Sequence, residues 1–151
     1  MIYKPIIWIV DTSIFTNVLN VPGRNQDRIN VLNDFHERIE NKDTFLLPYA
    51  AIVETGNHIA QLNGNLKYDL AKVFSTQVKL AIEGGTPWKP LNFPTQKSLL
   101  KWLDHFPDFS CKGISFGDFS IIKEWEQQKE LFNSYSVRIW SLDCNLQGYE
   151  S

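Results

Sequence analysis

The chain has 151 residues, 43% of them hydrophobic, which is the size and composition of one ordinary globular domain spanning residues 1–151. Its 15 basic and 17 acidic residues give a net charge of -2, which argues against a tight nucleic-acid binder, because such modules carry a basic surface. Cys111 and Cys144 match neither zinc-site spacing nor a disulfide framework, and no window is apolar enough to span a membrane. We expect a soluble, cytoplasmic protein.

The first predicted element is a strand over residues 6–10, an uninterrupted run of β-branched and aromatic side chains. Such a run is typical of a strand in a parallel sheet that helices cover on both faces. Asp11 follows directly, and Thr12 and Ser13 offer hydroxyls that can cap a short helix ending at Leu19. Asp11 is therefore expected at the carboxyl end of a central strand, the edge at which open α/β sheets bind ligands.

A helix and a second strand are predicted next. Residues 20–23 contain turn-forming Asn, Pro and Gly, and residues 25–41 show helical spacing of apolar side chains. The apolar positions of that helix are Ile29, Leu32, Phe35 and Ile39. Residues 44–47 form a short apolar strand that Pro48 closes. The order strand, helix, strand predicts a right-handed crossover and a parallel pair of strands.

A helix over residues 49–62 contains the second acid of interest. Glu54 follows an apolar triplet, and Asn57 and His58 lie three and four residues further on the same helical face. The side chains expected to face inward are Ile52, Val53, Ile59 and Leu62.

Two more helices are predicted in the middle of the chain. Residues 66–83 form the first, which a glycine pair ends, and its apolar positions are Leu66, Leu70, Val73, Phe74 and Leu80. Residues 96–106 form the second, which Pro107 is expected to break. Its apolar face could bury against a second copy of the chain, which would make a homodimer. Residues 88–93 fit either a loop or an edge strand.

The last predicted helix begins at Asp118, after a glycine-marked segment, and ends near residue 131. In its first turn, Asp118 would be stabilised by the helix dipole by about 0.3–1 kcal/mol. Residues 136–142 are rich in β-branched and aromatic side chains and read as a strand. This strand also ends in an acid, Asp143, with Asn145 two residues later, so the pattern of the first strand repeats.

The four acids Asp11, Glu54, Asp118 and Asp143 are expected at one rim of the sheet. Parallel strands place their carboxyl ends on one edge, and the helices that follow begin there. Carboxylates gathered so closely repel one another unless a cation neutralises them. Hard oxygen ligands without paired His or Cys favour Mg²⁺ or Mn²⁺ over Zn²⁺. Such an ion can bridge a phosphodiester and activate a water molecule.

Four segments of the chain resemble the PIN domain in identity, order and spacing. They are Val10-Asp11-Thr12-Ser13-Ile14-Phe15, Ile52-Val53-Glu54, Gly117-Asp118-Phe119-Ser120-Ile121-Ile122 and Ser141-Leu142-Asp143-Cys144-Asn145. The resemblance implies a three-layer α/β/α fold with a central, mainly parallel sheet. It also implies a Mg²⁺- or Mn²⁺-dependent endoribonuclease acting on RNA, and the family includes toxins that an antitoxin protein neutralises. Residues 63–112 match nothing specific in the family beyond helices.

The resemblance also implies roles for individual residues. Asp11, Glu54, Asp118 and Asp143 would be catalytic metal ligands, with Ser13 and Asn145 as supporting polar groups. Asn145 stands where many members have a second aspartate, which lowers the acidic charge and fits one metal ion rather than two. Phe119 and Trp125 are bulky where small residues often follow the third acid, so packing around the site, or a helix surface for a partner, could differ.

Each acid taken alone also has a structural interpretation. Asp11 can be an N-cap, and Asp118 a first-turn helix acid. Glu54 can lie on the surface or in a salt bridge, and Asp143 can belong to a turn. His58 is expected on a helix surface or at the edge of the core, because no second His or Cys stands at zinc spacing.

Basic residues that could contact substrate phosphates are Arg24, Arg28, Lys112, Lys123 and Arg138, each of which can instead be an ordinary solvated side chain. Cys144 is expected to be a small buried residue rather than a nucleophile, because no basic partner is identifiable. A catalytically inactive PIN-like binding or scaffold module is the main alternative function. A phospho-acceptor domain using Asp11 is a third, disfavoured because no lysine ends the last strand.

Overall fold

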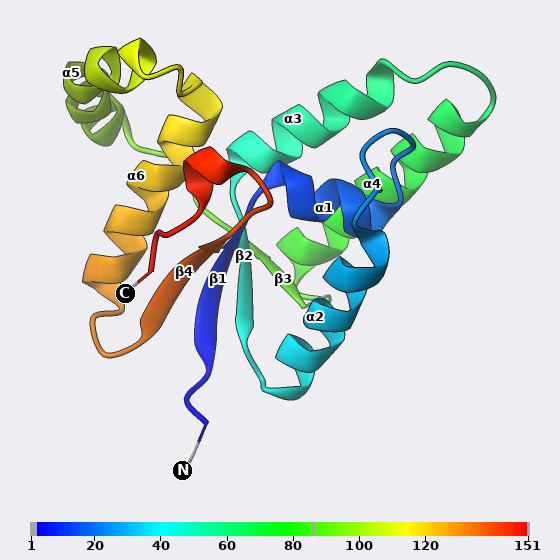
Figure 1. Cartoon of the computed structure of the whole chain (residues 1–151), viewed down its shortest axis with the longest axis horizontal. Coiled ribbons are helices and arrows are strands. Elements are labelled where there is room, and N and C mark those ends of the chain that lie inside the picture. The colour runs from blue at the N-terminus through cyan, green and yellow to red at the C-terminus, as the bar shows by residue number, and fades with distance from the viewer. Residues whose placement is uncertain (1–2, 86, 151) are drawn as a thin grey trace.

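The computed structural model describes residues 3–85 and 87–150, which form a four-stranded parallel sheet with helices on both faces (Figure 1). The elements are β1 (Ile6–Val10), α1 (Thr12–Leu19), α2 (Arg28–Glu40), β2 (Thr44–Leu47), α3 (Tyr49–Ala60), α4 (Leu66–Glu83), β3 (Trp88–Pro90), α5 (Gln96–Cys111), α6 (Phe116–Leu131), β4 (Ser136–Trp140) and the short 3₁₀ helix Cys144–Leu146. The strand order is β3-β2-β1-β4. The predicted three-layer α/β/α fold is confirmed.

The central strand β1 is buried on both faces, as its continuous apolar run predicts. Trp8 and Val10 belong to the core that α1, α2, α3 and α4 cover, whereas Ile7 and Ile9 pack on the opposite face with Trp125 of α6. Alternate side chains of a strand point to opposite faces, so one short strand supplies both cores. This burial fixes β1 in the middle of the sheet.

The pairing of β1 with β4 determines where the site lies. The two strands run in parallel register from Ile6 opposite Ser136 to Val10 opposite Trp140. The N–H of Asp11 donates to the carbonyl oxygen of Trp140 at 3.0 Å, which extends the pairing by one residue. The segments that follow β1 and β4 therefore leave the sheet at the same edge. Helices α1 and α3 begin at that edge too (Figure 1).

The expected break at Pro107 is wrong, because α5 continues through the proline to Cys111. Proline removes one backbone donor and crowds the preceding turn, which makes a helix end the usual outcome. Here Phe109 lies beyond the proline and packs on Phe119 of α6, with ring centroids 4.9 Å apart. We infer that this tertiary contact holds the last turn of α5 in place.

The start of the next helix also differs from the prediction. Helix α6 begins at Phe116 rather than at Asp118, because the Ser115 hydroxyl accepts the N–H of Asp118 at 3.1 Å and caps the helix. Asp118 still lies in the first helical turn, as expected. The ambiguous segment after residue 87 contains an edge strand, since β3 pairs with β2.

Several apolar positions expected to face the core are exposed. In α2 the buried pair is Val31 and Phe35, one turn apart, which indicates that this helix meets the core along a narrow stripe. Helix α4 packs against α3 and β3, so most of its circumference faces solvent. The exposed side chains predicted as inward are Ile29 and Ile39 in α2, Val53 in α3, and Leu66 and Val73 in α4. Cys144, expected to be buried, is exposed as well.

Candidate active site

A cavity of about 350 Å³ opens at the carboxyl edge of the sheet. Its lining includes all four of the predicted acids, namely Asp11, Glu54, Asp118 and Asp143. They come from the end of β1, from α3, from the first turn of α6 and from the segment after β4. The structure therefore brings together acids from distant parts of the chain, on the rim where the strand order places them.

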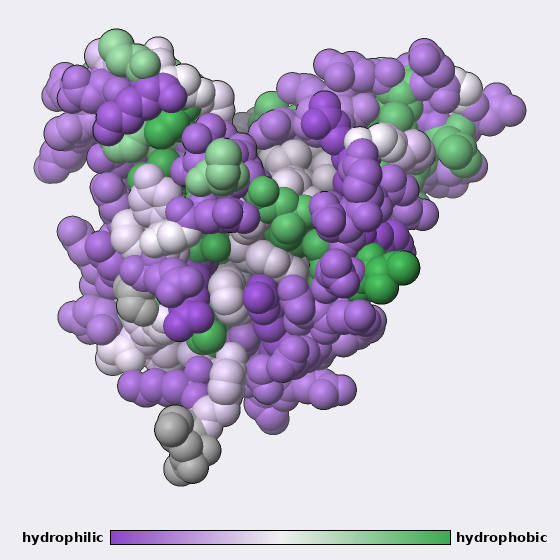
Figure 2. Space-filling model, in the orientation of Figure 1, coloured by the Kyte–Doolittle hydropathy of each residue, from purple (hydrophilic) through white to green (hydrophobic). Residues whose placement is uncertain are grey.

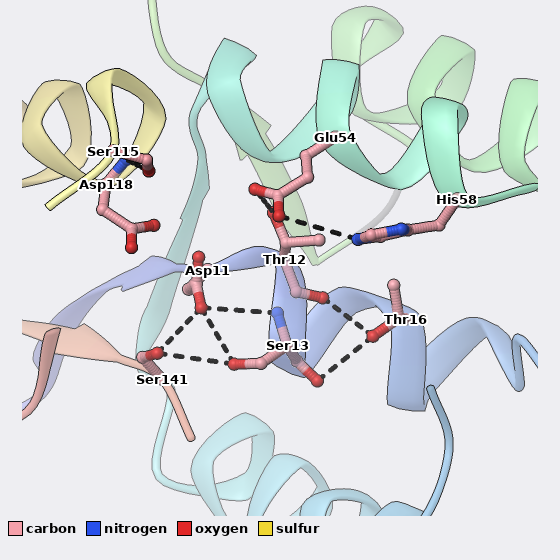
Figure 3. A network of polar contacts seen from close by, with 9 residues as sticks. All are labelled: Asp11, Thr12, Ser13, Thr16, Glu54, His58, Ser115, Asp118 and Ser141. Carbon is pink, nitrogen blue, oxygen red and sulfur yellow. Dashed lines mark hydrogen bonds and ion pairs between the residues drawn. The ribbon is translucent and has the colours of Figure 1, made fainter. Parts of the chain in front are cut away.

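Asp11 is buried, and its carboxylate is held from one side (Figure 3). Oδ2 accepts hydrogen bonds from the hydroxyls of Ser13 at 2.9 Å and Ser141 at 2.7 Å. It also accepts the Ser13 N–H at 3.4 Å, which makes Asp11 the N-cap of α1. Figure 3 shows the other carboxylate oxygen directed toward Asp118 and Glu54. Asp11 thus caps a helix with one oxygen and presents the other to the cavity.

Ser141 links the ends of β1 and β4. Its hydroxyl donates to Asp11 and accepts the N–H of Asp143 at 2.9 Å. The Ser13 hydroxyl accepts the Leu142 N–H at 2.9 Å, which adds a second connection between the same two segments. Asp143 in turn accepts the N–H of Asn145 at 2.9 Å and caps the 3₁₀ helix. The turn expected at Asp143 and its place in the cavity wall are therefore compatible.

Glu54 reaches the cavity from α3. Its Oε2 accepts the Thr12 hydroxyl at 3.1 Å, and its Oε1 lies 3.6 Å from Nε2 of His58, one turn further along the helix. The Glu54 side chain is 48% exposed, so water solvates much of its charge. His58 lines the cavity with it, which agrees with the helix-surface position expected for that histidine.

The pKa of Asp118 shows most clearly that the acids lie close together. Its pKa is raised to about 7 from an ordinary value of 3.8, first by burial and then by the negative charges of Asp11, Asp143 and Glu54. A hydrogen bond to Asp143 favours the protonated form as well. Desolvation and like charges both penalise a carboxylate, so the two causes act in the same direction. Near pH 7 the Asp118 carboxyl is therefore protonated in about half of the molecules.

The donor chemistry of this cavity fits a hard divalent cation, but the side chains are not drawn together around one point. Among the described residues, no three His, Cys, Asp or Glu side chains form a group placed to hold a metal ion. The shared cavity and the mutual charge effect nevertheless show that the acids interact. Charge repulsion acts over several ångströms, whereas ligand bonds to Mg²⁺ need about 2.0–2.1 Å. Binding of such an ion would therefore require the acidic side chains to move closer together.

The other predicted site residues are divided between the cavity and the rest of the surface. Ser13 and Arg24 line the cavity, whereas Asn145 is exposed and outside its described lining. Arg28 donates to the carbonyl oxygens of Asn17 and Val18 at the end of α1, at 2.8 and 2.7 Å. The remaining candidates also lie outside that lining: Lys112 near the Phe109 ring, Lys123 paired with Glu126, and Arg138 bound to Ser136 on β4.

Sequence reasoning missed residues that hold the acids in place. Ser141 directly follows β4 and lies two residues before Asp143, and its position one residue past a buried strand was the available signal. Thr12, which holds Glu54, was read only as a helix cap. Asp27 lines the cavity from the loop before α2, and no pattern in the sequence marks it.

The comparisons with known proteins leave the chain without a family assignment. No family model matches the sequence, and no curated protein is similar to it. Among the described helices, none is long and apolar enough to cross a membrane.

Proposed function

We propose that the protein is a metal-dependent endoribonuclease that uses Mg²⁺ or Mn²⁺ to hydrolyse RNA phosphodiester bonds. The observation that carries the proposal is the convergence of Asp11, Glu54, Asp118 and Asp143 on one cavity at the carboxyl edge of the sheet. The resemblance of the same four segments to the PIN domain supports it. That resemblance also supports, within the proposal, a cytoplasmic toxin held inactive by an antitoxin protein.

In this proposal the four carboxylates would hold the cation, and the hydroxyls of Ser13 and Ser141 hold the carboxylate of Asp11. Asp11 offers its free oxygen, while Ser13 and Ser141 prevent the side chain from turning away. Asp118 would hold the cation as a carboxylate, and its pKa of about 7 means that release of its proton would cost little free energy at neutral pH. A bound divalent cation supplies charge stabilisation for phosphodiester hydrolysis.

The test is cleavage of RNA by the purified chain with Mn²⁺, with Mg²⁺ and with excess chelator. We expect cleavage at internal positions with either ion and none with the chelator. A parallel melting experiment should show that Mn²⁺ raises the melting temperature, because an ion that binds only the folded state stabilises it. Cleavage that persists in chelator, or no cleavage under any condition, would contradict the proposal.

Arg24 is the basic residue best placed to contact a substrate phosphate. It lies on the cavity wall in a loop fastened to α1, where Oδ1 of Asn17 accepts the N–H of Asp27 at 3.1 Å. Arg24→Ala should raise KM for RNA about tenfold and change kcat little. A contact with a phosphate other than the one that is cleaved stabilises the bound substrate and the transition state equally. Lys112→Ala is the control, since Lys112 is exposed and outside the described cavity lining. Equal KM values for the two variants would show that Arg24 does not contact the substrate.

Ser141 should act as a positioning residue. Ser141→Ala removes the hydrogen bond to Asp11 and leaves the Asp143 N–H without its acceptor. We expect about a tenfold loss of Mn²⁺ affinity, which is typical when a group supporting a metal ligand is removed. Titration calorimetry with Mn²⁺ measures it, and Ser134→Ala on the exposed turn before β4 is the control. An unchanged affinity would show that Asp11 needs no support from β4.

A second candidate function is a binding or scaffold module without catalysis. The spacing of the acids, which form no metal-holding group among the described residues, favours this candidate, and so does the net charge of -2. Such a module would show no Mn²⁺ affinity that depends on Asp11 or Asp143. The calorimetric titration therefore separates the two functions without relying on a suitable RNA substrate.

A further inference from the structure

A second cavity, of about 460 Å³, adjoins the acidic one between the first turns of α3 and α6. The two cavities share Glu54 and Ser115 in their walls. Figure 2 shows the surface hollowed between the part formed by α5 and α6 and the part formed by α3 and α4. A ligand that occupies the acidic cavity can therefore extend into this second one without leaving the protein surface.

The second cavity differs from the first in chemistry. Its surface is mostly apolar, and Glu54, at the shared border, carries the only charge among its described lining residues. Two aromatic residues, Tyr49 and Phe116, line it from different helices. Asn57 adds an amide group at the rim. A mostly apolar cavity with aromatic walls, one amide and no basic side chain among its described lining residues does not suit a phosphate, but it suits a flat heteroaromatic ring with polar edges.

The two aromatic side chains are exposed and yet held in place. Tyr49 is 47% exposed and Phe116 is 39% exposed, so part of each ring is open to a ligand. The Tyr49 ring contacts the exposed Phe93 ring at a centroid distance of 4.2 Å, and Phe106 packs edge-to-face with Phe116 at 5.0 Å. Rings fixed by a neighbour lose little freedom when a ligand stacks on them, so the arrangement is prepared for binding.

We propose that this second cavity binds an unpaired nucleobase of the RNA strand whose phosphate occupies the acidic cavity. The inference rests on the proposed function and assigns a place on the protein to one base of its substrate. Nucleobases stack on exposed aromatic side chains with little dependence on sequence. The shared walls at Glu54 and Ser115 connect the base site to the acids, as a base is connected to its own backbone phosphate. A base paired within a duplex has its faces covered and cannot enter.

Binding of short RNA to the full chain tests the proposal independently of cleavage. The probes are fluorescein-labelled heptamers of identical charge, one of adenosines and one abasic throughout, measured by fluorescence anisotropy with Ca²⁺ in place of Mn²⁺, so that a hard cation can neutralise the acids when a phosphate approaches them. Gel electrophoresis after the titration checks that the probes are uncut. We expect the wild-type protein to bind the adenosine heptamer at least about fivefold more tightly than the abasic one. Equal affinities would overturn the base site. Failure of the nuclease proposal would be detected separately, by the loss of metal-dependent cutting in the assay above.

Matched variants locate the binding. Tyr49→Ala should abolish the preference for the adenosine heptamer while leaving abasic binding unchanged, and Tyr68→Ala, on exposed α4, should retain it. Gly117→Leu should also abolish it by filling the cavity, since a Cβ there would meet only the Ser115 hydroxyl, at 3.8 Å. A preference that survives both Tyr49→Ala and Gly117→Leu would overturn the assignment. So would a dimer that Tyr49→Ala dissociates in sedimentation, because the cavity would then be covered by a second copy.

Discussion

Asp11→Asn should reduce Mn²⁺-dependent RNA cleavage by at least about 100-fold, the scale expected when a charged ligand of a catalytic ion is lost. The fold should survive, because an asparagine oxygen can accept the same hydrogen bonds from Ser13 and Ser141. The position that faces the cavity would then carry the amide NH₂ group, which donates hydrogen bonds and cannot bind a cation. Initial rates at saturating Mn²⁺ measure the effect. A melting temperature close to that of the wild type shows that the variant is folded.

Asp69→Asn is the control for that substitution. Asp69 is an exposed acid in the first turn of α4, outside the described lining of the acidic cavity. The Asp69→Asn variant should retain full activity. Its rate shows whether removing one negative charge has a general effect on cleavage. Undiminished cleavage by Asp11→Asn would refute the nuclease proposal outright, whatever the behaviour of the other acids.

Asp118→Asn should stabilise the metal-free protein at pH 8 by about 2 kcal/mol, a figure reduced from the full shift because water screens a partly exposed carboxylate. The folded-state pKa of Asp118 is about 7, raised from 3.8. Between these values the folded protein holds a proton that the unfolded chain has released. The stability of the wild type therefore falls as pH rises from 3.8 to 7, and the advantage of the variant should vanish near pH 4. Urea unfolding at a series of pH values measures it.

Glu124 provides the matched comparison. Burial alone raises its pKa to about 7, with no contribution from neighbouring acids. Glu124→Gln should therefore also stabilise the protein above pH 7, but the gain should be independent of metal. With Mn²⁺ present, Asp118→Asn should no longer unfold with a higher free energy than the wild type. The bound ion removes the repulsion between the acids in the wild type, and the substitution removes the same repulsion without an ion. If Asp118→Asn lowers stability at pH 8 without metal, the acids are not crowded and the electrostatic argument is wrong.

The sequence was sufficient to predict the sheet and the positions of the acids on it. The run at β1 is continuous and apolar, β4 is rich in β-branched and aromatic side chains, and an aspartate comes soon after each, so strand type and direction follow from local pattern. Asp11 and Asp143 lie at one edge because parallel strands end together. Local pattern and tertiary structure agree here, since both depend on the same buried side chains.

Features set by long-range packing could not be predicted in this way. Helix α5 passes Pro107 because Phe109 has a partner on α6, which the local sequence does not reveal. The contact from Ser141 to Asp11 joins residues at opposite ends of the chain, and a single serine carries no signal of its partner. The exposure of Ile29 depends on how little of α2 the core covers. In each case the local sequence permits more than one structure, and a contact with a residue far away in the chain determines which one forms.

The order of the strands has a consequence for the newly made protein. β1 is the first strand to leave the ribosome and β4 is the last, yet they are neighbours in the sheet. Until translation has passed residue 143, Asp143 is absent and Asp11 lacks its bond from Ser141. A nascent chain of this protein therefore carries no completed cavity until residue 143 has left the ribosome.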